Sequence, residues 1–350
     1  MLRSMYSGIS GMKVNQTKLD VIGNNIANVS TTAFKASSAR FSDMLYQNSS
    51  EATAPTTTKG GTNATQVGLG AKLNSINKVM SQGNALSTGR SLDVCVDGEG
   101  YILVASGDTS FKDENPITEQ GTLAGGGNSI YFTRDGNFTL DKDGNLLTAS
   151  GYRVMGYLYE DTNNADTPSI GEDGVGNYVD LDANDGQKPA KSTLQAVGKG
   201  RQLNTLRIPN TVKVPDPAGG DAIEQPIVSF SIGSDGLIVG ILGNGSQTVL
   251  GQIATATFSN PEGLTDLGGG LATVSANSGA AVLRTPRGEL DALEENADAY
   301  GDIIQGCLEA SNVDLTEQFT DMITATRAFQ ASSKMISTAD EILQTITSLI

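Results

Sequence analysis

Apolar residues recur at helical spacing at both ends of the chain, and no other feature restricts the possible folds as strongly. Near the N-terminus they step by three, four and seven residues, as the a and d positions of a heptad do. These residues are Leu2, Met5, Ile9, Met12, Leu19 and Ile26. The pattern predicts a helix over residues 2–29 with a narrow apolar seam, in which Gln16 and Gly23 are weak positions.

The C-terminal end carries a stronger form of the same pattern. Large apolar residues recur every seven positions, and they are Leu315, Met322, Phe329, Ile336, Leu343 and Ile350. Three positions after most of them stand Ala325, Ser332, Ala339 and Ile346. The pattern predicts a helix with a ridge of large residues beside a groove of mostly small ones, which would let another helix approach closely. Asn312 and Asp314 are the two alternatives for its N-cap, and Glu317 favours its first turn.

The charges of the two ends complement each other. Residues 1–45 hold five basic and two acidic side chains, whereas residues 302–350 hold two basic and seven acidic ones. Opposite charge favours pairing of two amphipathic helices and helps to set their orientation. We therefore expect the two terminal helices to pair; the alternative is two surface helices packed separately on a core.

Between these ends, the sequence is typical of short strands joined by tight turns. Alternation over residues 92–96, the turn 97–100 and the apolar run 101–104 predict a hairpin. A second hairpin region, residues 132–154, has turns at Asp135-Gly136 and Asp143-Gly144. Further strands are expected at residues 227–232, 237–242, 248–258 and 271–274, and residues 48–66 form a low-complexity polar stretch.

The expected fold is therefore mixed and mainly β, with paired, coiled-coil-like N- and C-terminal helices and two β-rich domains inserted between them. Residues 1–30 and 306–350 are assigned to the helical part, and residues 31–66 to a linker. Residues 67–157 and 263–305 are assigned to an inner β-rich domain. Residues 158–262 are assigned to an outer one, which should fold separately.

Composition argues against catalysis. The chain contains no histidine, which excludes Ser-His-Asp and Cys-His mechanisms and histidine-containing zinc sites. A net charge of −16 argues against binding nucleic acid. Cys95, expected on the polar face of its strand, and Cys307 form no CxxC pair, and we expect both to be unpaired. We therefore expect that the chain has no enzymatic activity and binds no cofactor.

The candidate ligand sites have simpler interpretations. The segment 141–145 begins like a calcium loop, but Tyr152 stands where the loop needs a bidentate Glu, so a hairpin turn is preferred. The acidic segment 161–185 could hold a divalent cation, although a solvated loop is the usual role of such a run. The glycine clusters 125–127 and 268–270 lack a phosphate-binding lysine and indicate turns.

The N-terminus has no apolar run long enough for a signal-peptide core. The chain has no stretch of about 18 apolar residues, so no transmembrane helix is predicted.

Residues 2–35, which include DVIGNNIAN at positions 20–28, resemble the N-terminal signature of bacterial flagellar rod and hook proteins. Residues 308–346, beginning LEASNVDLTEQFTDMI, are similar to the family's C-terminal signature. QVGLGAKLNSI, STGRSLDVCVDGEGYILV and YFTRDGNFTLDKDGNLLTASGYRVMG resemble its β-rich inner domain.

The resemblance covers residues 1–47, 66–106, 130–157 and 306–350. Hook members match best, because about 105 residues, 158–262, lie beyond the inner-domain motif and suffice for an extra domain. Distal rod members are the alternative within the family, and a monomeric surface adhesin is the alternative from another class. Two residues depart from the family's pattern: Ala33 stands where a glycine is usual after the first helix, and Cys95 stands where a small apolar residue is more common.

The resemblance implies a structural subunit of the hook, a curved helical tube that acts as a universal joint and transmits motor torque from rod to filament. It implies self-assembly into a homopolymer, contacts with the distal rod, hook cap and hook–filament junction proteins, and no membrane insertion. It also implies export to the cell exterior by the flagellar type III apparatus without a cleaved signal. The expected assembly residues are the six apolar residues of the first helix together with Leu315, Met322, Phe329, Ile336, Leu343 and Ile346.

Overall fold

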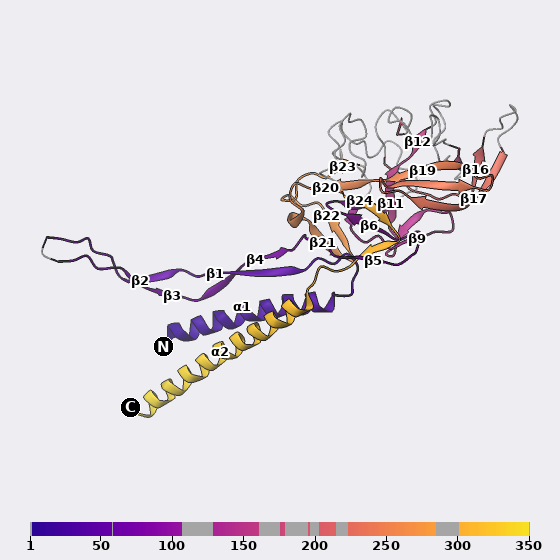
Figure 1. Ribbon diagram of the computed structural model, residues 1–350. Coiled ribbons are helices and arrows are strands. Elements are labelled where there is room, and N and C mark those ends of the chain that lie inside the picture. Colours follow the sequence, from indigo (N-terminus) through magenta and orange to yellow (C-terminus); the bar gives the residue numbers. More distant parts are fainter. Residues whose placement is uncertain are drawn as a thin grey trace. The chain divides into compact units, whose positions relative to one another are not determined.

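A computed structural model describes residues 2–57, 59–106, 129–160, 176–178, 195–196, 203–214, 223–284 and 301–349. Two long helices lie at the two ends, α1 (Leu2–Ala27) and α2 (Leu315–Ser348), with β-structure between them (Figure 1). This confirms the mainly β fold with terminal helices. The Gly125–Gly127 cluster and almost all of the acidic segment 161–185 lie outside the described residues.

The strands are short, as glycine-rich turns predict. The N-terminal third contains β1 (Ser37–Asp43), β2 (Tyr46–Ser50), β3 (Thr65–Gly68), β4 (Ala71–Lys78), β5 (Ala85–Ser87), β6 (Val94–Asp97) and β7 (Tyr101–Ser106). The middle contains β8 (Ser129–Thr133), β9 (Phe138–Leu140), β10 (Leu146–Thr148), β11 (Arg153–Tyr157), β12 (Tyr159–Glu160), β13 (Gly176–Asn177), β14 (Gln195–Ala196), β15 (Asn204–Thr205) and β16 (Thr211–Val214). The remainder contains β17 (Ile223–Ile232), β18 (Leu237–Leu242), β19 (Gln247–Ile253), β20 (Thr255–Thr257), β21 (Thr265–Gly268), β22 (Leu271–Thr273), β23 (Val282–Arg284), β24 (Asp302–Gln305) and β25 (Cys307–Glu309), and a 3₁₀ turn at Pro261–Gly263.

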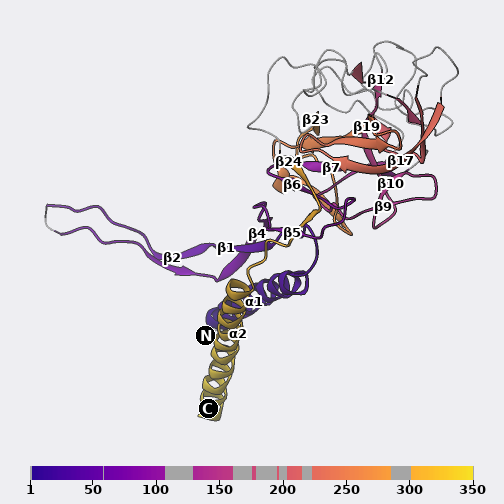
Figure 2. The same ribbon diagram turned by 45° about the vertical axis from the view of Figure 1, so that its right-hand side comes forward.

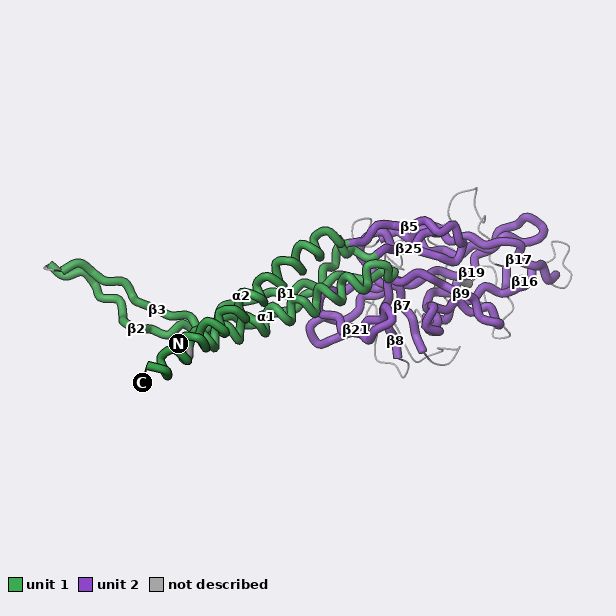
Figure 3. The backbone as a smooth tube through the Cα atoms, turned by 90° about the horizontal axis from the view of Figure 1, so that it is seen from below, with its two compact units in different colours: residues 1–81, 311–350 green, residues 82–310 purple. Residues whose placement is uncertain are grey.

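The chain divides into two compact units (Figure 3). Unit 1 comprises residues 1–81 and 311–350, and unit 2 comprises residues 82–310. The chain therefore enters unit 2 once and leaves it once, and unit 1 is built from both ends of the sequence.

Unit 1 combines the paired helices with a two-stranded antiparallel ribbon, residues 37–78, which we call the arm. β1 pairs with β4 at its base, and β2 pairs with β3 further out (Figures 1 and 2). The segment 31–66, expected to be a linker, therefore contains three of the arm's strand segments in whole or part. Thr and Ser side chains pair across the polar stretch, as in the contact between Ser50 Oγ and Thr65 Oγ1, 2.7 Å apart.

Unit 2 is built around one extensive sheet that crosses the expected border at residues 157/158. β11 pairs with β7 of the expected inner domain and also with β15 and β19 of the expected outer domain. A single apolar cluster contains residues from both sides of that border, including Val94, Val104, Leu206, Ile238 and Leu250. The described residues thus share a core across this border, and separate inner and outer folding units are not seen there.

The local predictions in the middle of the chain had mixed outcomes. β9 and β10 form a hairpin through residues 141–145, with Gly144 at a φ of 81°, which confirms the turn interpretation. β17, β18, β19 and β22 occur where strands were expected. The predicted β6–β7 hairpin was wrong, because β6 pairs with β24 and β7 pairs with β8, β11 and β20. Gly98 and Gly100 do have positive φ angles there, 112° and 140°, but local backbone chemistry does not determine which strand becomes the neighbour.

The expected position of Cys95 on a polar strand face was also wrong. Val94, Cys95 and Val96 are all fully buried, since β6 is covered on both faces. Alternation of apolar and polar residues predicts a half-exposed strand, and it fails for a strand enclosed on both sides.

Candidate assembly surfaces

Small residues allow the two helices of unit 1 to approach closely. A Cβ added at Gly8 would lie 3.1 Å from Ile336 Cγ1, and one added at Gly11 would lie 3.0 Å from Ser332 Oγ. Ala325 and Ala339, at heptad spacing from Ser332, are buried. The small-residue groove on α2 therefore receives α1 of the same chain. Gly8 and Gly11 of α1, which the heptad pattern did not single out, supply the other half of this close approach.

Polar contacts continue the pairing toward the start of α2. Lys18 Nζ lies 3.1 Å from Asp321 Oδ2, an ion pair of the kind that the opposite charges of the two ends predict. Being partly exposed, it contributes at most about 1 kcal/mol. Asp314 is the N-cap, because its Oδ1 accepts a hydrogen bond of 2.8 Å from Thr316 N. Of the two N-cap alternatives, Asp314 is thus confirmed.

The expected assembly residues of both helices are mostly half-buried in the single chain. On α1, Met5, Met12, Leu19 and Ile26 are half-buried, and Ile9 is exposed; Leu2 is the first residue of the helix. On α2, Met322, Phe329, Ile336 and Leu343 are half-buried, and Leu315 and Ile346 are exposed. The structure brings Ile336 against α1 at Gly8. The large side chains of the seam thus retain accessible surface in the single chain.

A second row of apolar side chains on α2 is more exposed still. Leu315, Phe319 and Ile323, spaced four residues apart, lie on one face of the helix, and we call them the outer stripe. Their exposed fractions are 39%, 50% and 62%. The heptad pattern did not include Phe319 and Ile323, although residues four apart lie on the same face of a helix. A contiguous apolar row of this kind on a helix indicates a surface that another protein covers.

The arm presents further apolar surface. Leu45 is 81% exposed and Tyr46 is 56% exposed, and both faces of β2 and β3 are open. Where it passes α1, the arm packs through small residues: a Cβ at Gly70, whose φ is 124°, would collide with the side chain of Ser10. An isolated two-stranded ribbon is marginally stable in water, so an exposed one gains stability when another surface covers it.

Two asparagine side chains lie at the base of the arm. The side chain of Asn25, 1% exposed, accepts a hydrogen bond from Ser37 N at 2.9 Å and donates to Ser37 O at 2.8 Å. It also donates to Gln318 Oε1 at 3.0 Å. Asn312 Oδ1 accepts from Ala36 N at 2.7 Å, and its Nδ2 donates to Val79 O at 2.7 Å. Asn25 stood in the quoted N-terminal signature, but sequence alone did not reveal this role.

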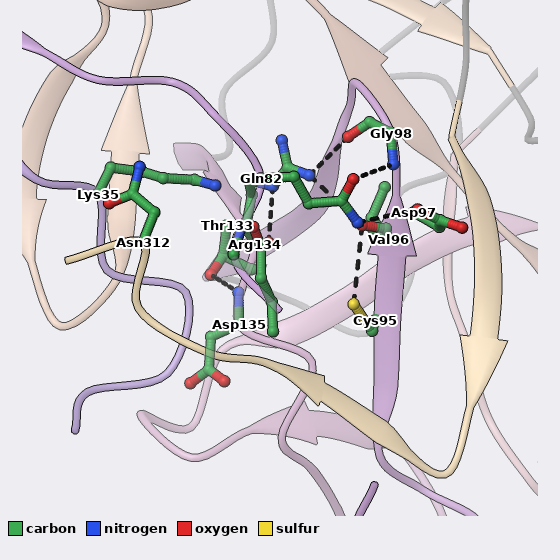
Figure 4. Close-up of polar contacts among 12 residues, drawn as sticks. Lys35, Gln82, Cys95, Val96, Asp97, Gly98, Thr133, Arg134, Asp135 and Asn312 are labelled. Atoms are coloured by element: carbon green, nitrogen blue, oxygen red, sulfur yellow. Dashed lines mark hydrogen bonds and ion pairs between the residues drawn. The ribbon is translucent and has the colours of Figure 1, made fainter. Parts of the chain in front are cut away.

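Unit 2 contains a buried ion pair that the sequence did not reveal either. Arg134 Nε lies 2.9 Å from Glu309 Oε2, and Arg134 also donates to the carbonyl oxygens of Val96 and Gly98 (Figure 4). Glu309 Oε1 accepts from Gly83 N at 3.0 Å. Burial, with the nearby Glu309 carboxylate, raises the pKa of the Cys95 thiol to about 11, so it stays protonated near neutral pH. This arrangement supports a structural role rather than a reactive site.

Within the described ranges, no group of three or more His, Cys, Asp or Glu residues is placed to hold a metal ion. Across the same part of the chain, none of the helices has the length and apolar character needed to span a membrane. Both cysteines are free thiols.

Three family models match the chain. Residues 5–35 match "Flagella basal body rod protein", residues 122–178 match "Flagellar hook protein FlgE/F/G D1 domain", and residues 304–349 match "Flagellar basal body rod FlgEFG protein C-terminal". The chain is 38% identical to the flagellar basal-body rod protein FlgG of Bacillus subtilis, over 100% of this chain and 99% of that protein.

Hook proteins are also similar to the chain. Identity with the flagellar hook protein FlgE of Borreliella burgdorferi is 28% over the whole of both chains. With FlgE of Helicobacter mustelae it is 42%, over 49% of this chain and 34% of that protein. The crystal structure of the Helicobacter pylori flagellar hook protein FlgE2 aligns with a TM-score of 0.38 at 11% identity, covering 64% of this chain and 100% of that one.

Proposed function

The chain belongs to the family of flagellar rod and hook proteins, which are structural components of the bacterial flagellum, and on this basis we propose that it is the repeating subunit of the flagellar hook. In this proposal, copies of the chain assemble into a curved tube that joins the rod to the filament and transmits torque while it bends. The observation that carries the proposal is the apolar surface left open on the paired helices of unit 1.

The helix pair supplies the axial connection in this proposal. The outer stripe of one copy packs against the helices of its neighbours around a central channel. Burying a Leu, Phe or Ile side chain is worth about 1.5–3 kcal/mol, so three of them add several kcal/mol to each subunit contact. The half-buried ridge, including Met322, Phe329 and Leu343, adds to the same contact. The arm covers part of a further copy through Leu45 and Tyr46.

Unit 2 would allow bending. In the proposed tube its outward surfaces contact neighbouring copies through polar side chains, and modest polar interfaces permit sliding. Contacts with the distal rod, the hook cap, the hook–filament junction and the type III export apparatus belong to the same proposal, as does the location of the tube outside the cell.

The distal rod is the second candidate, and a specific observation favours it. Alignments with the Borreliella and Treponema hook proteins extend over 469 and 491 positions, more than the 350 residues of this chain, so those hook proteins contain segments that it lacks. Alignments with rod proteins extend over 343–354 positions. The higher identity with the Helicobacter mustelae hook protein over half of the chain favours the hook.

Immunogold electron microscopy of isolated hook–basal bodies separates the two candidates. Antibody raised against the purified chain should label the curved tube outside the outermost ring, and a strain lacking the gene should retain its rod but lose that tube. Labelling only of the rod, after the tube is stripped away, would show that the rod assignment is correct. Absence of label from every flagellar part would contradict both.

A further inference from the structure

The side chains of Asn25 and Asn312 connect the base of the arm to the helix pair. Asn25 lies in the last turns of α1, and Asn312 lies two residues before the Asp314 cap of α2. Both side chains are directed at backbone atoms of the arm's base. Asn25 hydrogen-bonds the N–H and the C=O of Ser37, the first residue of β1, and so acts as one more strand partner for it.

Asn312 bonds backbone atoms that flank both strands at the base of the arm. Its Oδ1 accepts from Ala36 N on the β1 side. On the β4 side, its Nδ2 donates to Val79 O at 2.7 Å and to Ser81 O at 3.1 Å. The backbone bond from Val79 N to Ala36 O, 2.8 Å, closes the same small ring of contacts. A single amide therefore holds the two strands at their separation where the arm leaves the helices.

The two asparagines depend on each other through the helix pair. Asn25 donates to Gln318 Oε1 of α2, so its orientation requires α2 to lie beside α1. Buried Lys35 strengthens the same junction by donating to Ser81 O at 2.8 Å. Further out along the arm, Ala71 N donates to Ser10 Oγ of α1 over a longer distance of 3.4 Å.

We propose that Asn25 and Asn312 form an amide clamp that makes order in the arm conditional on pairing of α1 and α2. When the helices pair, the two amides are placed to fix the first residues of β1 and the end of β4, and the ribbon is held in one direction. When the helices separate, the clamp opens, and a two-stranded ribbon with both faces exposed is only marginally stable. If the proposed function holds, the helix pairing that builds the tube also presents the arm to the next copy.

A disulfide that locks the helix pair allows the clamp to be tested without any polymer. A Cβ at Gly11 would lie 3.8 Å from Ser332 Cβ, within the usual range for a disulfide, so Gly11→Cys with Ser332→Cys should cross-link the helices. Cys307→Ser in the same chain removes the partly exposed native thiol. Amide hydrogen exchange is then measured by mass spectrometry on the locked full-length chain.

Asn312→Asp and Asn25→Asp are the test variants in this background. Each keeps an acceptor oxygen but replaces the donating NH₂ with a second oxygen that faces carbonyl groups. Residues 37–43 and 71–78 should exchange about tenfold faster in either variant, while α1 and α2 exchange as before. Asn28→Asp is the matched control, because this partly exposed side chain donates to Asn24 at the end of its own helix, and it should leave the arm unchanged.

Unchanged exchange in the arm of both clamp variants would overturn the proposal. Faster exchange in the helices by the same factor as in the arm would also overturn it, because that would indicate general destabilisation. Since no tube is formed in this experiment, its failure would leave the hook and rod assignments untouched.

Discussion

Ala33 adopts a left-handed backbone conformation, with a φ of 56°. Among the described residues, all others with a positive φ are glycines. It stands in the turn after α1, where the family resemblance implies a glycine. A β-carbon in this conformation costs about 1–2 kcal/mol. An alanine at this position left the conformation of the turn uncertain from the sequence. In the structure the turn is left-handed despite the β-carbon of Ala33, and the residue is therefore strained.

Replacing Ala33 with glycine should therefore stabilise unit 1. We expect Ala33→Gly to raise the free energy of unfolding by on the order of 1 kcal/mol, because relief of the left-handed strain exceeds the extra freedom of glycine in the unfolded chain. Urea denaturation followed by circular dichroism at 222 nm, where the two helices dominate, measures this. Ala39→Gly in β1, whose φ is ordinary, is the control and should destabilise the unit instead.

Two ion pairs of the chain should contribute very different amounts to the free energy of unfolding. Glu309→Gln leaves the buried Arg134 guanidinium without its carboxylate and should cost about 3–5 kcal/mol of stability. Asp321→Asn removes the partly exposed pair with Lys18 and should cost less than about 1 kcal/mol. Urea denaturation measures both costs. It is followed by tyrosine fluorescence for Glu309→Gln and by circular dichroism for Asp321→Asn.

The double variant Arg134→Met with Glu309→Leu provides the control for the buried pair. It removes both charges and should recover most of the stability that Glu309→Gln loses, because no charge remains buried. Equal costs for Glu309→Gln and Asp321→Asn would show that the Arg134–Glu309 pair is not insulated from solvent.

Helix α2 carries two surfaces with separate roles, one toward α1 and one open to solvent. The groove of Ala325, Ser332 and Ala339 receives α1, whereas the outer stripe of Leu315, Phe319 and Ile323 faces away from that seam. The two surfaces can therefore be altered independently, which a single seam would not allow.

Ile323→Asp should block assembly and leave the free chain folded. Ile323 is 62% exposed, so a carboxylate there costs the single chain little, but it would be buried without a partner in a subunit contact. Sedimentation of assembled tubes should fall to background, while the circular dichroism of the free chain stays unchanged. Gln330→Asp, at an exposed polar position of the same helix, is the matched control. If Ile323→Asp forms normal tubes, the outer stripe is not part of the assembly surface.

Periodicity and turn signals predicted both terminal helices and several strands of unit 2, because these depend on residues close in sequence. They missed three features that depend on residues distant in sequence. The glycines of α1 matter because of Ser332 and Ile336, the clamp depends on Asn25 meeting Ser37 and Gln318, and β6 pairs with β24 some 200 residues away. The arm was missed because its outer strands are polar and exposed on both faces, so no buried face produces an alternating pattern.

At the scale of the whole molecule, the shared core of unit 2 changes what a large deletion should do. The sequence predicted that residues 158–262 form an outer domain that folds separately. In the structure that segment contributes β19, which pairs with β11, and β20, which pairs with β7. Its loss would remove Leu206, Ile238 and Leu250 from the shared apolar cluster and expose Val94 and Val104, which pack in the same cluster.

We therefore expect the chain with residues 158–262 replaced by a Gly-Ser linker to lose the fold of unit 2. Near-ultraviolet circular dichroism should collapse, and the protein should bind a hydrophobic dye. Inserting the same linker at the exposed turn Asn244-Gly245, with nothing removed, is the control and should preserve the fold. A soluble, cooperatively unfolding deletion variant would instead show that the two parts of unit 2 are separable.

A helical reconstruction of tubes assembled from the purified chain would show whether the terminal helices form the contacts between copies. If the paired terminal helices form the assembly surface, the reconstruction should show α1 and α2 lining a channel, with Phe319 and Ile323 of each copy buried against helices of neighbouring copies. Tubes in which these side chains face solvent and the copies contact one another only through unit 2 would contradict the account.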